Sequence, residues 1–377
     1  MALLLLLVAF AAYAQDFSPG RIIDAVKCAA DPSQSYALFV PSSYSAGRLW
    51  PVIFAFDPAA RGRIPVERYQ AAAETYGYIV AGSHNSRNGS WTASMMAAQA
   101  TVTDVTTRFM IDPARIYTAG MSGGARVALG VALASGQVAG VIASSAGYPD
   151  SKSRKTVPFA IFSTAGNEDF NFLEMRRLDR ELTSPHYLAV FEGGHVWLPS
   201  ELATEAVEWM EIQAMKSGRK PRDPARLDAI YAKRAAGVSA KTSGKETLLA
   251  LEAVVADFGG LKDVSELAAR AALLGRDKQV RDALKKDRDE ENREQRQMDE
   301  ILSMENRLSS DDRHSILAQL RDRWKKLAAA SNHPADSVDR RIARRILRGL
   351  SAGAAERSKD EDYRKIVEEF RPPRAVR

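Results

Sequence analysis

One pentapeptide, Gly-Met-Ser-Gly-Gly at residues 120–124, constrains the fold of this chain more than any other feature. It follows a β-rich run at residues 115–119 and precedes residues 125–135, which predict a helix. Between a strand and a helix, G-x-S-x-G forms a nucleophile elbow, a turn so tight that its serine takes strained backbone angles. The two outer glycines keep side chains out of the crowded turn. The motif therefore predicts that Ser122 projects from the carboxyl end of a strand as a nucleophile.

The chain around this motif alternates β-rich runs with helical stretches from about residue 35 to 215. We expect strands at residues 36–40, 51–56, 78–81, 115–119, 138–144, 157–163 and 187–191. We expect helices between them at residues 66–76, 92–109, 125–134, 172–182 and 200–215. Continuous apolar strands that alternate with helices indicate an α/β fold, with a mostly parallel sheet covered by helices on both faces. Functional side chains in such folds gather at the carboxyl ends of the strands.

After residue 215 the composition changes. Residues 217–224 are polar and contain two prolines, which predicts a linker between a sheet domain at 15–216 and an all-α region at 225–377. Helices are expected at residues 225–242 and 245–258 as a hairpin, then at 263–274, 310–331 and 334–351. The charged stretch 285–297 is expected to be a solvated helix or a spacer, and Pro372 and Pro373 to end the ordered chain. The hairpin loosely resembles a tetratricopeptide unit, but about three such units are needed for a stable solenoid.

The first residues predict a signal peptide at 1–14. An apolar run ends in Ala-Tyr-Ala at residues 12–14, which fits a small-residue cleavage site, and the run is too short to cross a bilayer. We therefore expect export to the periplasm or the medium, with no membrane span after cleavage; the alternative is a buried N-terminal strand or helix. Cys28 is the only cysteine, so no intramolecular disulfide can form.

The charge of the chain is uneven. Residues 1–217 carry a net charge of −2 and residues 218–377 a net charge of +8. The sheet domain thus gives no reason to expect a polyanionic substrate, and the helical region could bind a protein partner or associate with itself. Basic residues there are interleaved with acidic ones, so nucleic-acid binding is not expected. No Cys/His cluster has metal spacing, and neither a metal nor an organic cofactor is predicted.

A serine nucleophile needs a base, and the base needs an orienting group. Among the five histidines, His195 follows the predicted strand 187–191 through two glycines, which would place its ring at the carboxyl edge beside Ser122. Residues 164–170, after the preceding strand, contain both Glu168 and Asp169 as candidate orienting acids. The residues alone leave this choice open, since either carboxylate could instead cap the following helix.

These motifs together resemble the α/β-hydrolase superfamily over residues 35–215, and within it the esterases similar to polyhydroxybutyrate depolymerases and feruloyl esterases. Those proteins carry a G-x-x-D motif for the acid and often G-G-H-x-W around the base. Residues 166–169 (Gly-Asn-Glu-Asp) and 193–197 (Gly-Gly-His-Val-Trp) match both motifs. The resemblance implies that Asp169 is the acid and His195 the base, in the chain order Ser…Asp…His of this superfamily.

The oxyanion hole departs from that pattern. The N–H of Gly123, which follows the nucleophile, is expected to be the first donor. Related esterases usually have His-Gly after the strand at 51–56, whereas this chain has Asp57-Pro58-Ala59. Proline has no N–H, so the second donor would have to be Ala59 or a neighbour. Asp57 could line the pocket or cap its own loop. The loop at residues 84–91 could also border the pocket or be an ordinary surface loop.

The sequence therefore favours an exported serine hydrolase, most plausibly a carboxylic ester hydrolase that works through an acyl-enzyme. Two alternatives stay open. A serine peptidase would use the same triad, and a scaffold protein could keep the hydrolase fold with weak or no activity and bind a partner through its helical tail.

Overall fold

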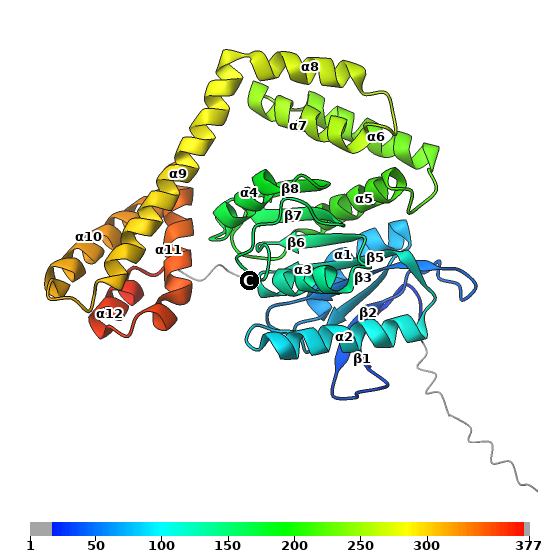
Figure 1. Cartoon of the computed structure of the whole chain (residues 1–377), viewed down its shortest axis with the longest axis horizontal. Helices are drawn as coiled ribbons and strands as arrows, with labels where there is room; N and C mark the ends of the chain where they lie inside the picture. The colour runs from blue at the N-terminus through cyan, green and yellow to red at the C-terminus, as the bar shows by residue number, and fades with distance from the viewer. Residues whose placement is uncertain (1–16, 373–377) are drawn as a thin grey trace, which may run out of the picture.

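The computed structural model describes residues 17–372 of the chain (Figure 1). The predicted signal peptide at 1–14 lies outside these residues. Cys28 is buried as a free thiol.

An eight-stranded sheet forms the centre of the larger part of the molecule. Its strand order is β1-β2-β4-β3-β5-β6-β7-β8. The β1–β2 and β2–β4 pairs are antiparallel, and every other pair is parallel. The strands are β1 (Ile22–Lys27), β2 (Ser35–Phe39), β3 (Trp50–Phe56), β4 (Ile79–Ser83), β5 (Ile111–Met121), β6 (Gly140–Ser144), β7 (Ala160–Gly166) and β8 (His186–Phe191).

Helices cover both faces of this sheet. They are α1 (Arg63–Tyr76), α2 (Trp91–Arg108), α3 (Gly123–Ser135), α4 (Phe172–Glu181) and α5 (Ser200–Lys216). Helices α2, α3 and α4 pack on one face, whereas α1 and α5 pack on the other. The central strand β3 serves both layers, since Phe54 faces α2 and α3 while Ile53 faces the opposite layer. The predicted α/β fold class, with its mostly parallel sheet, is confirmed.

Strand β1 was not predicted. Its residues alternate poorly, because Asp24 and Ala25 are both exposed and the pairing with β2 is irregular between Ile23 and Val26. An edge strand that buries little apolar surface leaves only a weak periodic signal in the sequence. The chain therefore begins its sheet one strand earlier than expected.

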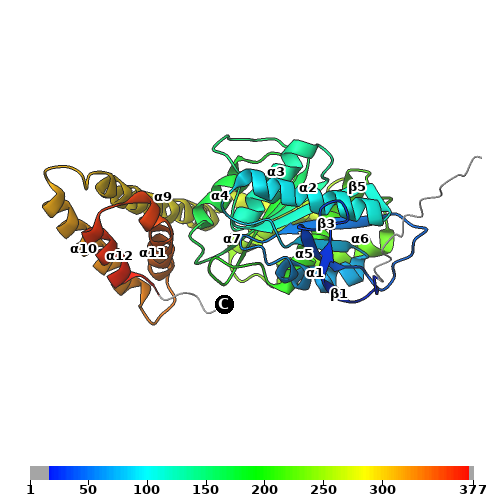
Figure 2. The same cartoon turned by 90° about the horizontal axis from the view of Figure 1, so that it is seen from below.

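The rest of the described chain is helical, as predicted. Its helices are α6 (Pro224–Ser239), α7 (Gly244–Phe258), α8 (Ser265–Arg276), α9 (Lys278–Asn306), α10 (Arg313–Ser331), α11 (Val338–Arg357) and α12 (Glu361–Phe370). Helices α6, α7 and α8 share a small core with the end of α5. The second half of α9 joins α10, α11 and α12 in a separate core, which we call the C-terminal bundle, and Figures 1 and 2 show it beside the sheet domain.

Two helical features differ from expectation. The charged stretch at 285–297 is helical, as one of its two predicted alternatives had it, but it is the middle of the 29-residue helix α9 and not a separate element. Helix α12 was not predicted, although it begins with the Asp360 cap, and its Tyr363 and Ile366 enter the core of the bundle. Its ten residues are too few to give a strong periodic signal before the prolines that follow.

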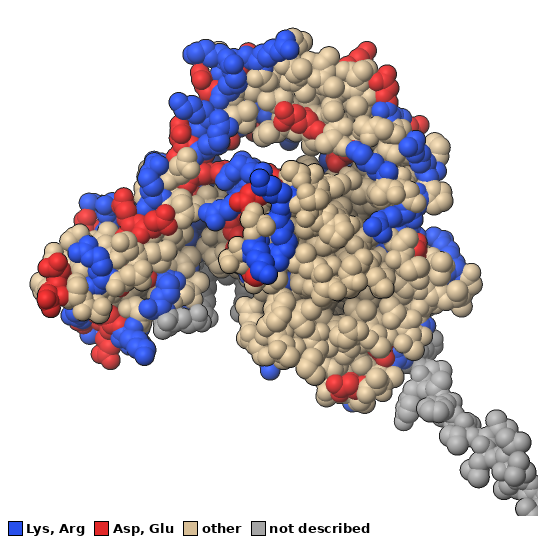
Figure 3. Space-filling view, viewed as in Figure 1, with Lys and Arg blue, Asp and Glu red and all other residues tan. Residues whose placement is uncertain are grey.

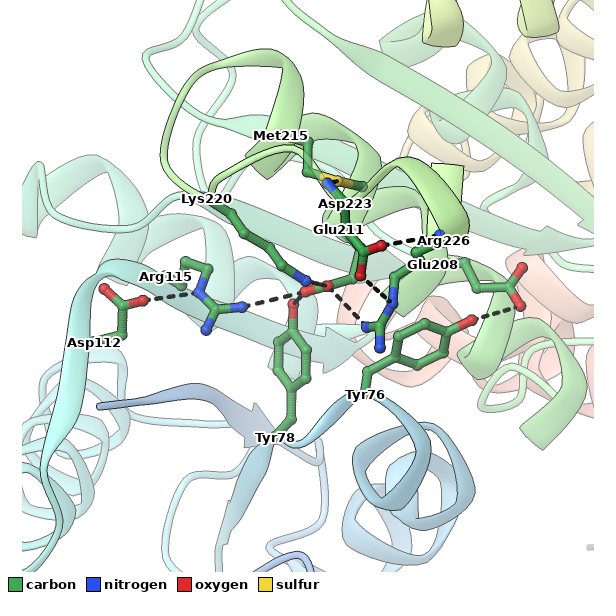
Figure 4. A network of polar contacts seen from close by, with 10 residues as sticks. All are labelled: Tyr76, Tyr78, Asp112, Arg115, Glu208, Glu211, Met215, Lys220, Asp223 and Arg226. Carbon is green, nitrogen blue, oxygen red and sulfur yellow. Dashed lines mark hydrogen bonds and ion pairs between the residues drawn. The ribbon is translucent and has the colours of Figure 1, made fainter. Parts of the chain in front are cut away.

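A buried ion network joins the first part of the helical region to the sheet domain (Figure 4). Glu211 of α5 is fully buried and accepts hydrogen bonds from Tyr78 (2.6 Å), Arg115 (3.4 Å) and Arg226 of α6 (3.3 Å). Lys220, in the segment between α5 and α6, also donates to this carboxylate. Burial, together with the nearby Glu211 carboxylate, raises the pKa of Tyr78 well above its usual value. Tyr78 and Arg115 lie toward the amino ends of their strands, away from Ser122.

Glu211→Ala should destabilise the protein by about 3–5 kcal/mol, because it leaves cations and a tyrosine hydroxyl at a buried site without their acceptor. Urea unfolding followed by circular dichroism measures this loss. The exposed Glu201, in the first turn of the same helix, is the control, and Glu201→Ala should cost about 1 kcal/mol or less. Equal effects for the two variants would show that the network does not stabilise the fold.

Candidate active site

Ser122 lies between the end of β5 and the start of α3, with φ 54° and ψ −123°. A positive φ is unfavourable for a residue with a side chain, and the surroundings hold it in place. The Ser122 N–H donates to the carbonyl of Ser144 at 2.8 Å, and the Ser122 carbonyl accepts from the N–H groups of Ala125 and Arg126. The turn is also crowded, since a Cβ on Gly124 would lie 1.9 Å from the carbonyl oxygen of Phe56. Only glycine fits there.

His195 lies in the loop after β8 and reaches both other members of the predicted triad. Its Nε2 is 2.8 Å from Oγ of Ser122, and its Nδ1 is 2.8 Å from Oδ1 of Asp169. Gly166 of β7 lets this loop approach the strand, because the carbonyl oxygen of Gly193 lies 2.3 Å from where a Cβ on Gly166 would be. The imidazole is thus held between a hydroxyl and a carboxylate, which is the arrangement that activates a serine.

The two candidate acids have different partners. Asp169 is fully buried, and its Oδ1 also accepts the N–H of Asn171 at 2.8 Å. The Glu168 side chain instead pairs with Arg344 (2.5 Å) and Arg348 (3.3 Å) of α11. Geometry therefore brings Asp169, and not Glu168, to His195; the catalytic role of each residue stays a prediction.

The oxyanion side of the site departs from the sequence expectation. The N–H of Gly123 opens α3, and the first N–H groups of a helix have no acceptor within the helix. The N–H of Ala59, the predicted second donor, is engaged by Oδ1 of Asp57 at 2.8 Å. That prediction is corrected: the Ala59 N–H is committed to a buried carboxylate and is not available to an oxyanion.

Asp57 is fully buried and ties two loops of the site together. It accepts hydrogen bonds from Arg61 (2.9 and 3.1 Å) and from the indole Nε1 of Trp197 (2.7 Å), two residues after His195. Burial alone would raise the pKa of Asp57, but the hydrogen bonds from Arg61, Trp197 and the Ala59 N–H together lower it below its ordinary value. Of the two roles left open by the sequence, Asp57 has the structural one: it caps its own loop and does not line a pocket.

The C-terminal bundle contributes to the loop that carries the acid. Arg345 of α11 donates from Nη1 to the Asn167 carbonyl at 2.5 Å, and its Nε and Nη2 form a two-point pair with buried Glu294 of α9. Arg344 and Arg348 bind Glu168, as described above. We call these contacts of three arginines with residues 167 and 168 the α11 clamp. Sequence reasoning missed it because more than 170 residues separate the partners.

Phe170 was also missed. Its ring stacks on the imidazole of His195 with centroids 3.9 Å apart and planes 28° from parallel. On its other side Phe170 approaches α11, with its Cβ 3.4 Å from where a Cβ on Gly349 would be. The stacked ring restricts rotation of the imidazole about its hydrogen bond to Asp169. Its position directly after Asp169 is the only sequence signal that could have indicated it.

The charges on the surface follow the division of the chain. Figure 3 shows basic and acidic side chains mixed over the helical region and a group of Lys and Arg over α4, whereas the side of the sheet domain that carries α2 and α3 shows few charges. Within residues 17–372, no group of three or more His, Cys, Asp or Glu side chains is placed to hold a metal ion. No helix of this part of the chain is long and apolar enough to span a bilayer.

Comparison with known proteins gives matches among solved structures only; no protein-family model matches the chain, and no curated protein matches it. A thermostable esterase is 18% identical, with a TM-score of 0.40, over 50% of this chain and 61% of the esterase. Est1E from Butyrivibrio proteoclasticus is 14% identical, with a TM-score of 0.39, over 51% of this chain and 99% of Est1E. An esterase from Pyrobaculum calidifontis is 12% identical, with a TM-score of 0.41, over 52% of this chain and 86% of that enzyme.

The elbow at Ser122, the mostly parallel sheet with helices on both faces, and the order Ser…Asp…His along the chain are the defining features of one fold. This chain has the α/β-hydrolase fold, extended by an all-α region.

Proposed function

We propose that the chain is a serine hydrolase that cleaves carboxylic esters. The observation that carries this proposal is the pair of 2.8 Å contacts that His195 makes with Ser122 Oγ and Asp169 Oδ1. Ser122 attacks the ester carbonyl while Nε2 of His195 takes its proton. The imidazolium is stabilised by Asp169 and returns the proton to the departing alkoxide, which leaves an acyl group on Ser122. Water, activated by the same histidine, then releases the acid.

The oxyanion side favours esters over amides as substrates. In this proposal the Gly123 N–H binds the oxyanion, but no N–H exists at Pro58 and that of Ala59 is engaged. Loss of one donor typically lowers turnover by about 10²–10³-fold. Esters are intrinsically more reactive than amides toward a serine nucleophile, so they suit an oxyanion hole that has a single backbone donor. On the apolar run and small-residue site at residues 1–14 we further propose that the enzyme is exported.

A fluorophosphonate probe tests the proposal directly. The probe should label the wild-type protein covalently, and Ser122→Ala should abolish the labelling, because only an activated serine attacks phosphorus readily. Mass spectrometry of the labelled peptide locates the adduct. As a control, Ser90→Ala changes a serine that caps α2, and the variant should still be labelled. A folded wild-type protein that stays unlabelled would favour the scaffold alternative instead.

A panel of substrates then separates esterase from peptidase. p-Nitrophenyl esters of increasing acyl length should be hydrolysed, whereas the matching p-nitroanilides should be turned over far more slowly. Faster cleavage of the anilides would contradict the assignment to esters.

A further inference from the structure

The proposed reaction requires a second group to bind the oxyanion, and neither Pro58 nor Ala59 supplies a free backbone N–H for it. Two hydrogen-bond donors usually hold the oxyanion of an acyl transfer, and side-chain amides can take this role as well as backbone N–H groups. The inference below rests on the proposed function and concerns where this second donor comes from.

Asn88 lies in the segment between β4 and α2 and is fixed beside the same loop. Its N–H donates to the carbonyl of Pro58 at 2.8 Å. The neighbouring residue, Arg87, forms an antiparallel bridge with Ala59. The Asn88 backbone is therefore bound to the very residue whose missing N–H leaves the oxyanion hole incomplete.

The side chain of Asn88 reaches the residue that follows the nucleophile. A Cβ on Gly123 would lie 1.8 Å from Oδ1 of Asn88, 2.9 Å from its Cγ and 3.5 Å from its Nδ2. The amide thus occupies the space that a side chain at position 123 would fill. It lies directly against Gly123, the residue whose N–H is the first oxyanion donor of the proposal. Asn88 is exposed, so the amide can also meet a substrate.

This contact explains the glycine at 123. Gly123 is not one of the glycines with a positive φ in the described chain, so its backbone conformation does not require glycine. A Cβ would collide with the Asn88 amide, whose Oδ1, Cγ and Nδ2 are the three nearest atoms to it. Glycine is needed at 124 for the close approach of α3 to β3, whereas glycine is needed at 123 to admit the Asn88 side chain.

We propose that the side-chain amide of Asn88 is the second oxyanion donor of this enzyme. Rotation of the amide by 180° about its terminal torsion exchanges Oδ1 and Nδ2, which brings an N–H donor to the position beside Gly123. As negative charge develops on the carbonyl oxygen, the Gly123 N–H and the Asn88 Nδ2–H bind it together. A side-chain donor replaces the backbone donor that Pro58 removes.

Steady-state hydrolysis of a p-nitrophenyl ester tests the role. Asn88→Ala should lower kcat by about 10²–10³-fold and change KM by less than about threefold, because the donor acts mainly in the transition state. Asn88→Asp keeps the size of the side chain but has no N–H donor, and it should lose at least as much. The control is Asn292→Ala, the same change at an exposed position of α9, which should leave both constants unchanged.

A double-mutant cycle adds a readout that a general loss of structure would not give. Gly123→Ala should displace the Asn88 amide and lower kcat by itself. If both changes remove the same interaction, the double variant should be about as slow as the worse single variant. Thermal melting of each variant shows that it is folded.

The outcomes separate this inference from the proposed function. If wild-type protein is labelled and Ser122→Ala is inactive, but Asn88→Ala and Asn88→Asp keep kcat within about threefold, the oxyanion role of Asn88 is wrong and the esterase assignment stands. If both variants lose kcat at constant KM, the inference is supported. If the wild-type protein neither hydrolyses esters nor reacts with the probe, the proposed function fails and the role of Asn88 fails with it.

Discussion

Replacing His195 with alanine should lower kcat for a p-nitrophenyl ester by a factor on the order of 10⁵–10⁶. Among residues 17–372, the imidazole is the one group hydrogen-bonded to the Ser122 hydroxyl that can take its proton, and Nε2 is 2.8 Å from that oxygen. Without it the serine attacks as a neutral hydroxyl, and the alkoxide leaves without a general acid. Stopped-flow or long-time assays of ester hydrolysis with highly purified variant protein measure the residual rate.

Two further variants make this result specific. His314→Ala changes an exposed histidine of α10 and should keep the wild-type rate. The double variant Ser122→Ala/His195→Ala should be no slower than either single variant, because the two residues act as a unit. Additive losses would contradict a shared role in one proton transfer.

Replacing Asp169 with asparagine should lower kcat by about 10⁴-fold while the fold is kept. The carboxylate accepts a hydrogen bond from Nδ1 of His195, which leaves Nε2 unprotonated and directed at Ser122. An amide that donates to Nδ1 would favour the opposite tautomer, with the proton on Nε2. The same change also removes the negative charge that stabilises the imidazolium.

Glu168→Gln is the matched control for this prediction. Glu168 is the neighbouring acid, but it binds Arg344 and Arg348 instead of His195. Its amide variant should therefore lose far less activity than Asp169→Asn. A larger loss for Glu168→Gln would reverse the assignment of the acid. Comparison of kcat and KM for both variants, with melting temperatures, decides between the two residues.

Most of the sheet domain could be predicted from sequence, and the reason is visible in β3. Its seven residues are all buried, so the apolar run is continuous and the strand is unmistakable. The elbow is equally clear, because the glycines at 120 and 124 are required by close backbone contacts that no other residue allows. Strand β1 lacks both signals, since it lies at the edge of the sheet and Val26 is the one buried residue of its six.

The parts of the site that could not be predicted depend on contacts between distant segments. Asp57, two residues before Ala59, is a local signal that the Ala59 N–H can be engaged, whereas the bond from Trp197 that holds the same carboxylate comes from a distant segment. The position of Asn88 beside Gly123 likewise requires two loops to meet. Short-range patterns identify which residues can do chemistry, whereas long-range contacts decide which of them are free to do it.

The α11 clamp bonds the C-terminal bundle to the loop that carries Asp169. Arg345 is bound at once to Glu294 inside the bundle and to the Asn167 carbonyl, two residues before Asp169. Any ligand or partner that shifts the bundle relative to the sheet domain therefore changes the free energy of the loop that orients His195. Linkage is reciprocal, so occupation of the active site must alter the affinity of the bundle for that partner by the same factor. The helical extension thus contacts, across more than 170 residues of chain, the loop that positions Asp169 beside His195.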